Sequence, residues 1–164
     1  MRLNLSEIIE IPGASLPFEA ELDTEGLDFP AIAAYRSRPR ALGRVVNEAG
    51  VLRLEGRLTA ELECICDRCG AEFPCTKQTR LHATIVEEDD GENPELFLLE
   101  GNEIDLDEIL VTNFVLDMDS KLLCREDCRG LCQTCGKNLN LGPCGCRKEP
   151  DPRFAVLEQL LDKE

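Results

Sequence analysis

The fold is decided by residues 51–66, which read VLRLEGRLTAELECIC. Apolar or small residues occupy every second position from Leu52 to Cys66, and polar residues fill the positions between them except at Ile65. Successive side chains of a β-strand point to opposite faces, so this period of two predicts a long strand with one buried face. Gly56 falls on that face and predicts a bulge or bend, because glycine weakens a straight strand interior.

Similar patterns flank this strand. Residues 47–50 predict a turn that follows a strand over 41–46, and residues 76–86 resume the alternation with their apolar residues on one face. Cys66 and Cys69 then lie at the tip of a hairpin. Shorter alternating pieces occupy the first 30 residues, between glycines and prolines.

Two helices are expected after the strands. Asp105 is a suitable N-cap for a helix over 106–116, which has acidic residues in its first turn. Asp151-Pro152 predicts the start of a short C-terminal helix, which must dock on the sheet to be stable.

The predicted fold class is α+β: an antiparallel β-meander or barrel-like sheet with a few short helices and a C-terminal cysteine-rich zinc-binding module. The expected segments are a β-rich core over 1–86, an acidic loop and helix over 87–119, a zinc-knuckle module over 120–149 and a docking helix over 150–164.

Charge is unevenly distributed along the 164 residues. The net charge is −15, and the segment 87–119 contributes −13 of it because it holds 13 acidic and no basic side chains. Such a block stays solvated or docks on a basic partner. The acidic balance therefore favours a protein over bare RNA as the principal partner.

Arginines form a basic counterpart upstream of this block. Six arginines against two acids lie in residues 36–57: Arg36, Arg38, Arg40, Arg44, Arg53 and Arg57. They are candidates for contacts with nucleic-acid phosphates, and the alternative is that they solubilise an exposed sheet face. The chain has one tyrosine and no tryptophan, so a base-stacking platform is not indicated.

The expected cellular compartment decides whether the cysteines are interpreted as disulfides or as metal ligands. The first residues lack the apolar core of a signal peptide, and no uncharged apolar stretch reaches the ~18 residues that span a bilayer. A cytoplasmic chain without membrane association is therefore expected. Thiols stay reduced in that compartment, so Cys-x2-Cys pairs there indicate metal binding more often than disulfides.

The strongest local motif is Cys132-x2-Cys135-Gly136, in which a tight turn brings two thiolates to one metal. Cys144 and Cys146 offer two further ligands and would complete a structural Zn²⁺ site. Cys124 and Cys128 are alternative ligands in place of a member of that second pair, since Cys124, Cys128 and Cys132 are spaced by four and would share one face of a helical turn.

Cys66-x2-Cys69-Gly70 has the same local form. Three interpretations stay open: half of a second metal site completed by Cys132 and Cys135, a redox dithiol, or a tight hairpin tip whose cysteines only pack. Cys64 lies on the core-facing side of its strand, and Cys75 is expected not to be a ligand.

Signs of catalysis are scarce. The sequence has no P-loop, no Gly-x-Gly-x-x-Gly and no Gly-x-Ser-x-Gly, and its one histidine, His82, falls on the polar face of a strand. We therefore expect a non-enzymatic protein without a small-molecule substrate. The rival hypothesis is a thiol redox or redox-sensing protein that uses Cys66 and Cys69.

Several stretches together resemble the YceD family, which is named for large ribosomal RNA subunit accumulation. These are residues 62–73 (LECICDRCGAEF), 103–106 (EIDL), 123–140 (LCREDCRGLCQTCGKNLN) and 151–157 (DPRFAVL). The family often has an apolar segment with proline before the second cysteine cluster, whereas residues 115–121 here read VLDMDSK.

The resemblance implies a bacterial or plastid protein with a role in large-subunit assembly and no established enzymatic activity. Cys66, Arg68 and Cys69 match the family's Cys-x-Arg-Cys tip, and the six later cysteines match its second cluster, which some members lack. The implied partners are a pre-ribosomal large subunit, a ribosomal protein and large-subunit rRNA.

Overall fold

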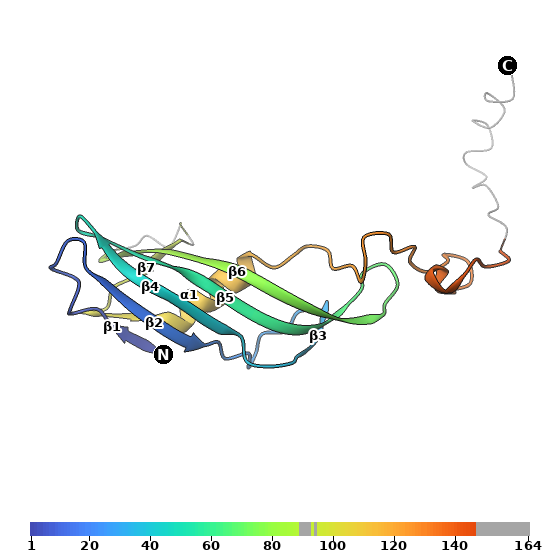
Figure 1. Cartoon of the computed structure of the whole chain (residues 1–164), viewed down its shortest axis with the longest axis horizontal. Helices are drawn as coiled ribbons and strands as arrows, with labels where there is room; N and C mark the ends of the chain where they lie inside the picture. Colours follow the sequence, from blue (N-terminus) through green and yellow to red (C-terminus); the bar gives the residue numbers. More distant parts are fainter. Residues whose placement is uncertain (89–92, 94, 147–164) are drawn as a thin grey trace, which may run out of the picture.

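The computed structural model shows an open sheet with a helix on one face and a cysteine-rich segment beyond one end (Figure 1). It describes residues 1–88, 93 and 95–146. The strands are β1 (Arg2–Asn4), β2 (Ser15–Glu21), β3 (Ile32–Tyr35), β4 (Arg40–Glu48), β5 (Val51–Ile65), β6 (Glu72–Val86), β7 (Leu96–Leu98) and β8 (Glu103–Asp105). The helices are α1 (Leu106–Leu116) and a 3-10 turn, η1 (Leu139–Leu141).

Six strands form the main sheet in the order β2-β4-β5-β6-β7, and β3 pairs with β5 beyond the end of β4. All neighbours are antiparallel except β6 and β7. β1 and β8 form a separate two-stranded sheet. The expected barrel-like form is wrong within the described residues, because β2 and β7 are separate edges and the chain continues from β7 through β8 to α1, which covers one face of the sheet.

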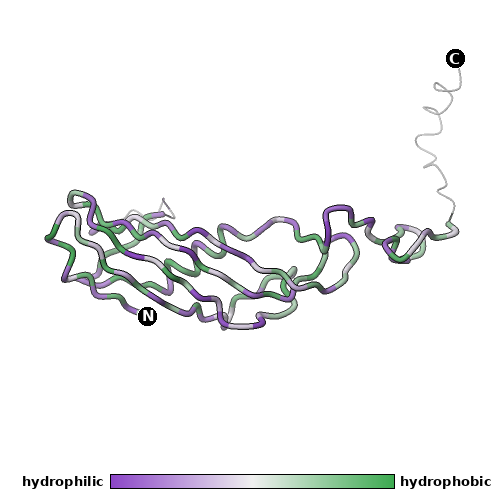
Figure 2. The backbone as a smooth tube through the Cα atoms, in the orientation of Figure 1, coloured by the Kyte–Doolittle hydropathy of each residue, from purple (hydrophilic) through white to green (hydrophobic). Residues whose placement is uncertain are grey.

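The hydrophobic core lies between this sheet and α1. Alternate residues of β5 and β6 are buried, as the alternation predicts, and Figure 2 shows hydrophilic and hydrophobic residues alternating along the strands. The helix contributes Leu106, Ile109, Leu110 and Phe114. Phe114 packs edge-on against Phe29 with 5.8 Å between ring centroids. The α+β class is therefore confirmed.

Gly56 does not form a bulge, because the pairing of β5 continues through it on both sides. A Cβ atom added there would lie 2.5 Å from the carbonyl oxygen of Leu42 and 2.8 Å from Cα of Gly43. At Gly43, an added Cβ atom would lie 2.6 Å from the ring of Phe18, so the ring occupies the space that a side chain would need. Glycine is thus required at position 56 by the close approach of β4.

Helix α1 spans the predicted residues, and the side chain of Asp105 accepts a hydrogen bond from Asp107 N at 3.1 Å. On the last turns of the helix, Asn113 Oδ1 accepts from His82 N at 3.0 Å, which ties α1 to the edge of β6 beyond β7. No helix among the described residues has the length and hydropathy needed to cross a bilayer. The predicted C-terminal helix over 150–164 lies outside them, as does most of the acidic loop.

Lys77 holds the chain as it leaves α1. Its side chain is 12% exposed, and Nζ lies 3.3 Å from Asp117 Oδ2 and 3.1 Å from Asp119 Oδ2. Burial lowers the pKa of Lys77, but the two carboxylates outweigh burial, and the pKa is raised overall. The end of the acidic segment is therefore fixed to β6.

Asn47 anchors the N-terminal segment. Its buried Nδ2 donates to the carbonyl oxygens of Ile8 at 2.8 Å and Ile9 at 2.6 Å, and its Oδ1 accepts from Gly50 N at 2.8 Å. One side chain thus joins the start of the chain to the β4–β5 turn.

Candidate functional site

The tip of the β5–β6 hairpin carries the first pair of thiols, as predicted. Gly70 N donates to Cys66 O at 2.8 Å, and Cys66 N donates to Ala71 O at 2.9 Å. Gly70 has φ +66°, a conformation that glycine adopts without steric cost. This turn brings the sulfurs of Cys66 and Cys69 to the same side of the tip.

The same turn recurs at Cys132. Gly136 N donates to Cys132 O at 2.8 Å, Cys132 N donates to Lys137 O at 2.9 Å, and Gly136 has φ +72°. The repeated Cys-x2-Cys-Gly sequence therefore produces the same backbone turn twice.

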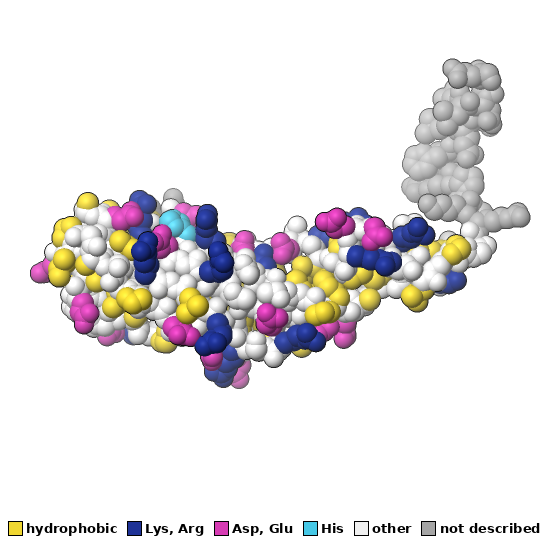
Figure 3. All heavy atoms as spheres, viewed as in Figure 1, with side chains coloured by type: hydrophobic (Ala, Val, Ile, Leu, Met, Phe, Trp, Pro, Cys, Tyr) yellow, Lys and Arg dark blue, Asp and Glu magenta, His cyan; other side chains and the backbone are white. Residues whose placement is uncertain are grey.

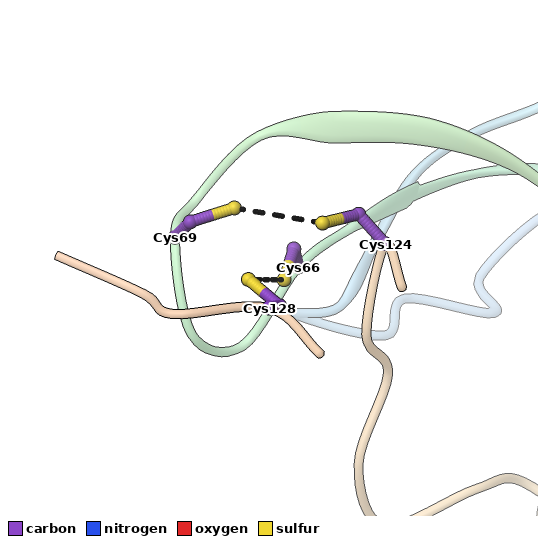
Figure 4. A group of neighbouring side chains, drawn as sticks. All are labelled: Cys66, Cys69, Cys124 and Cys128. Carbon is purple, nitrogen blue, oxygen red and sulfur yellow. Dashed lines mark hydrogen bonds between the residues drawn. The ribbon is translucent and has the colours of Figure 1, made fainter. Parts of the chain in front are cut away.

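Four sulfurs converge at the hairpin tip, in what we call the tip group: Cys66, Cys69, Cys124 and Cys128 (Figure 4). All lie within 4.8 Å of one another, with 3.7 Å between the sulfurs of Cys66 and Cys128 and 3.8 Å between those of Cys69 and Cys124. A tetrahedral Zn²⁺ with Zn–S bonds of about 2.3 Å requires sulfurs about 3.8 Å apart. The spacing of the tip group fits that ion.

A second set of four, the distal group, consists of Cys132, Cys135, Cys144 and Cys146, also within 4.8 Å of one another. The sulfurs of Cys132 and Cys144 are 3.3 Å apart. Lys137 Nζ donates to Pro143 O at 2.9 Å and so closes the loop between the two halves. This set is more exposed than the tip group, and it too can hold a metal ion.

Two of the groupings that the sequence left open differ from the observed one. Cys124 and Cys128 join the hairpin tip rather than the Cys144–Cys146 pair, and Cys132 and Cys135 do not complete the tip. The chain turns between the two sets, where Gly130 has φ +73° and Leu131 N donates to Arg68 O at 3.1 Å, so the expected helical turn does not form.

Cys64 and Cys75 belong to neither group. Cys64 is fully buried in the main core, as expected, and Cys75 is half-buried beside that core. Burial raises the pKa of Cys64 to about 12, with a further contribution from Cys75, so Cys64 stays protonated at neutral pH.

The two residues inside the tip turn hold the segment that supplies the other two thiols. Asp67 N donates to Leu122 O at 2.9 Å, and Asp67 Oδ2 accepts from Leu122 N at 2.5 Å. Arg68 Nη1 donates to Cys128 O at 2.8 Å. Sequence reasoning did not identify these positioning roles, although both residues stand between the two cysteines of the motif.

Backbone dipoles favour a thiolate at the tip. Burial opposes ionisation of Cys66, but N–H groups of Cys124, Cys69 and Arg68 outweigh it and lower the pKa of Cys66 to about 6. Burial and neighbouring thiols raise the pKa of Cys124 to about 12. A bound cation would favour the thiolate form of all four cysteines.

The distal group shows the same division. Backbone N–H groups of Cys135 and Thr134 lower the pKa of Cys132 to about 6, and the contact with Cys135 raises the pKa of Cys146 to about 12. Each group thus holds at least one thiol whose pKa is lowered and at least one whose pKa is raised.

Asn140 links the two groups. Its Nδ2 donates to Cys128 Sγ at 3.3 Å and lowers the pKa of that thiol, and its Oδ1 accepts from Arg129 N at 2.8 Å. Asn140 lies in η1, between the two halves of the distal group. The loop of the distal group therefore contacts the tip group through this side chain.

The candidate arginines lie partly on the sheet face opposite α1. Arg40, Arg44, Arg53 and Arg57 project from it, whereas Arg36 and Arg38 precede β4. Four of the six form ion pairs: Arg36 with Glu63, Arg40 with Glu19, Arg44 with Glu55 and Arg53 with Glu48. Much of the basic charge on this face is thus neutralised across strands.

Sequence reasoning missed Arg80, which shares this face with His82, the histidine that the alternation placed on the polar side of its strand. A hairpin with its tip at Cys66 and Cys69 pairs Ile65 with Glu72 and hence Arg57 with Arg80. Counting back from the tip would have placed Arg80 beside the arginines already identified.

Comparison with known proteins identifies the family. The family described as large ribosomal RNA subunit accumulation protein YceD matches residues 54–161, a range that contains most of β5, all of β6 and α1, and both cysteine groups. The chain belongs to the YceD family. The resemblance seen in the sequence is thereby confirmed.

Individual relatives add little to this. Uncharacterized proteins of Mycobacterium bovis and Mycobacterium tuberculosis are each 36% identical over 61 residues, which is 37% of this chain and 30% of each relative. The match thus covers less than a third of the length of those relatives. No solved structure matches the chain.

The redox hypothesis gains no support. Dithiols of oxidoreductases usually lie at a helix N-terminus, which lowers a thiol pKa. In this YceD-family chain Cys66 and Cys69 instead cap a hairpin and belong to a set of four sulfurs.

Proposed function

We propose that this YceD-family chain is a non-enzymatic, zinc-binding factor in the cytosol that supports accumulation of large-subunit rRNA. It does so by binding a pre-ribosomal large subunit through a ribosomal protein, rRNA or both. Family membership supports a role in the accumulation of large-subunit rRNA. The observation that carries the molecular part is that eight of the ten cysteines form two sets of four.

The donor sets support structural zinc. Zn²⁺ in structural sites takes four Cys or His ligands and keeps no open position, whereas catalytic sites have three protein ligands and a water. Each set here offers four thiols to one ion. A closed coordination shell leaves no place for a substrate, which supports a non-enzymatic role.

The metals would replace a hydrophobic core in the cysteine-rich segment. Between Leu123 and Cys146 only Cys128 and Gly130 are buried. So little buried surface cannot order a segment of this length, and small domains of this kind rely on metals or disulfides. We propose that zinc fixes the segment as a rigid extension of the hairpin tip, ready to meet the ribosomal particle.

Two surfaces suit two kinds of partner. The acidic segment 87–119 suits a basic ribosomal protein, which the net charge of −15 favours as the principal contact. The basic side chains of the open sheet face suit rRNA phosphates.

The function is tested by depletion and rescue. Cells depleted of the protein should show a lower ratio of large- to small-subunit rRNA, and the tagged parent protein should co-sediment with large-subunit precursors. Rescue should succeed with the parent and with Cys75→Ser, and fail with Cys66→Ser. An unchanged rRNA ratio together with sedimentation only as free protein would contradict the proposal.

A further inference from the structure

A shallow hollow of about 810 Å³ lies on the open face of the sheet, opposite α1. Arg44, Arg57, Arg80, Glu55, His82 and Leu42 line it, together with backbone at the Gly43–Gly56 crossing. Figure 3 shows basic side chains gathered on this face around the histidine. Three arginines against one glutamate give the hollow a net charge of +2 with His82 neutral, in a chain whose net charge is −15.

Arg57 and Arg80 are direct partners across β5 and β6. Side chains at such positions have Cβ atoms about 4.5–5.5 Å apart, and like charges there destabilise the sheet. Neither arginine forms an ion pair with any described residue, whereas the other three arginines of β4 and β5 on this face each pair with a glutamate.

The acids around the hollow have other partners or lie in an adjoining recess. Glu55 pairs with Arg44. Glu95 and Asp117 line a recess of about 260 Å³ that also borders Arg80 and His82, and Asp117 pairs with Lys77. The fold therefore places two arginines opposite each other across β5 and β6 without an ion-pair partner among the described residues. A bound anion between them would convert the repulsion into attraction.

The surroundings indicate which anion fits. Guanidinium groups bind phosphate through paired N–H donors. Leu42 is 59% exposed and lies with Pro17 at the same hollow, so apolar surface adjoins the arginines. A nucleotide presents a phosphate beside a ribose and an apolar base face, whereas an acidic peptide presents carboxylates beside polar backbone.

We infer that this hollow binds the phosphate backbone of RNA, with Arg57 and Arg80 on one phosphate and Leu42 against the adjoining nucleotide. The inference rests on the proposed function, because rRNA is the polyanion that the protein would meet. It assigns a site to Arg80, which the sequence did not single out.

The test uses the full metal-loaded chain and a fluorescein-labelled 12-nucleotide oligouridylate, with anisotropy measured over a range of KCl concentrations. Arg57→Gln/Arg80→Gln should weaken binding about ten-fold or more and reduce the slope of log K against log salt by about 0.7 for each lost phosphate contact. Arg40→Gln/Arg53→Gln removes the same charge from the same face, outside the hollow, and should weaken binding less than about three-fold.

Thermal denaturation provides the control for folding. Because the substitution of Arg57 and Arg80 relieves a like-charge contact, the double variant should melt at or above the parent's temperature. Lower stability of this variant, equal effects of the two double variants, or tighter binding of a deca-aspartate peptide than of the oligouridylate would overturn the inference. The last result would indicate an acidic protein partner.

Co-sedimentation separates the two proposals. A parent protein that fails to co-sediment with large-subunit precursors contradicts the proposed function. A parent that does co-sediment, with Arg57→Gln/Arg80→Gln binding the oligouridylate as tightly as the parent, contradicts the phosphate site alone.

Discussion

The metal content of cysteine variants is the sharpest prediction, because the tip group and the distal group share no cysteine. The parent should bind two zinc ions per chain. Cys128→Ser and Cys132→Ser should each bind one, and the double variant none. Cys75→Ser should keep two, since Cys75 lies in neither group.

The structural effect of losing the tip metal depends on the hydrogen bonds that hold residues 122–146 at the hairpin tip. Four hydrogen bonds join it to the tip turn: two between Asp67 and Leu122, one from Arg68 to Cys128 and one from Leu131 to Arg68. They contribute about 1 kcal/mol each. Ordering the backbone costs about 1–2 kcal/mol per residue. Four bonds therefore cannot order 122–146, and structural zinc, at roughly 10–16 kcal/mol per site, must supply most of the rest.

Elemental analysis of protein purified under reducing conditions measures the stoichiometry, and hydrogen exchange locates the change. Chelation should abolish amide protection in 122–146 and leave β4, β5 and β6 protected, because their core does not include the metal groups. One zinc per parent chain, two in Cys128→Ser, or loss of metal from Cys75→Ser would refute the assignment. Iron in place of zinc would refute the identity of the metal ion.

Three further predictions concern stability. Gly56→Ala should destabilise the sheet by about 1–3 kcal/mol through the clash with β4, whereas Gly145→Ala, where the added Cβ meets open space, should leave the sheet's thermal midpoint unchanged. Asn47→Ala should cost about 2–4 kcal/mol in urea denaturation because three hydrogen bonds are lost, and a cost below about 0.5 kcal/mol would contradict its anchoring role. Lys77→Met should cost about 1 kcal/mol. Because the pKa of Lys77 is raised on folding, that difference should be constant at neutral pH and shrink as the pH rises above about 10.4, and a difference that grew at high pH would argue against the pairing.

Local features were predictable from the sequence, because they depend on neighbours in the chain. The period of two gave β5 its length and faces, Asp105 marked the start of α1, and the repeated Cys-x2-Cys-Gly motif predicted two tight turns. The role of Gly56 was not predictable, because it depends on how closely β4 approaches across the sheet.

The grouping of the cysteines was unpredictable for a longer-range reason. Cys66 and Cys128 are 62 residues apart, and whether they meet depends on where α1 returns the chain. Lys77 sets that point, since it holds Asp117 and Asp119 beside β6. Five residues from Asp119 to Cys124 can span at most about 17 Å, which is also the length of β6 from Lys77 to Glu72. The chain therefore reaches the tip at Cys124. Cys132 lies further along the chain, after it has left the tip.

The placement of charge explains how an acidic chain can offer a phosphate site. Asp105, Asp107 and Glu108 belong to the start of α1, which packs on the core face of the sheet, whereas Arg57 and Arg80 project from the opposite face. Elements packed face to face are about 10 Å apart. The acids at the start of α1 therefore lie across the core from the hollow, and the side chains that line the hollow are closer to a phosphate bound there. Binding of RNA there should therefore depend on the arginines of the hollow far more than on the net charge of the chain.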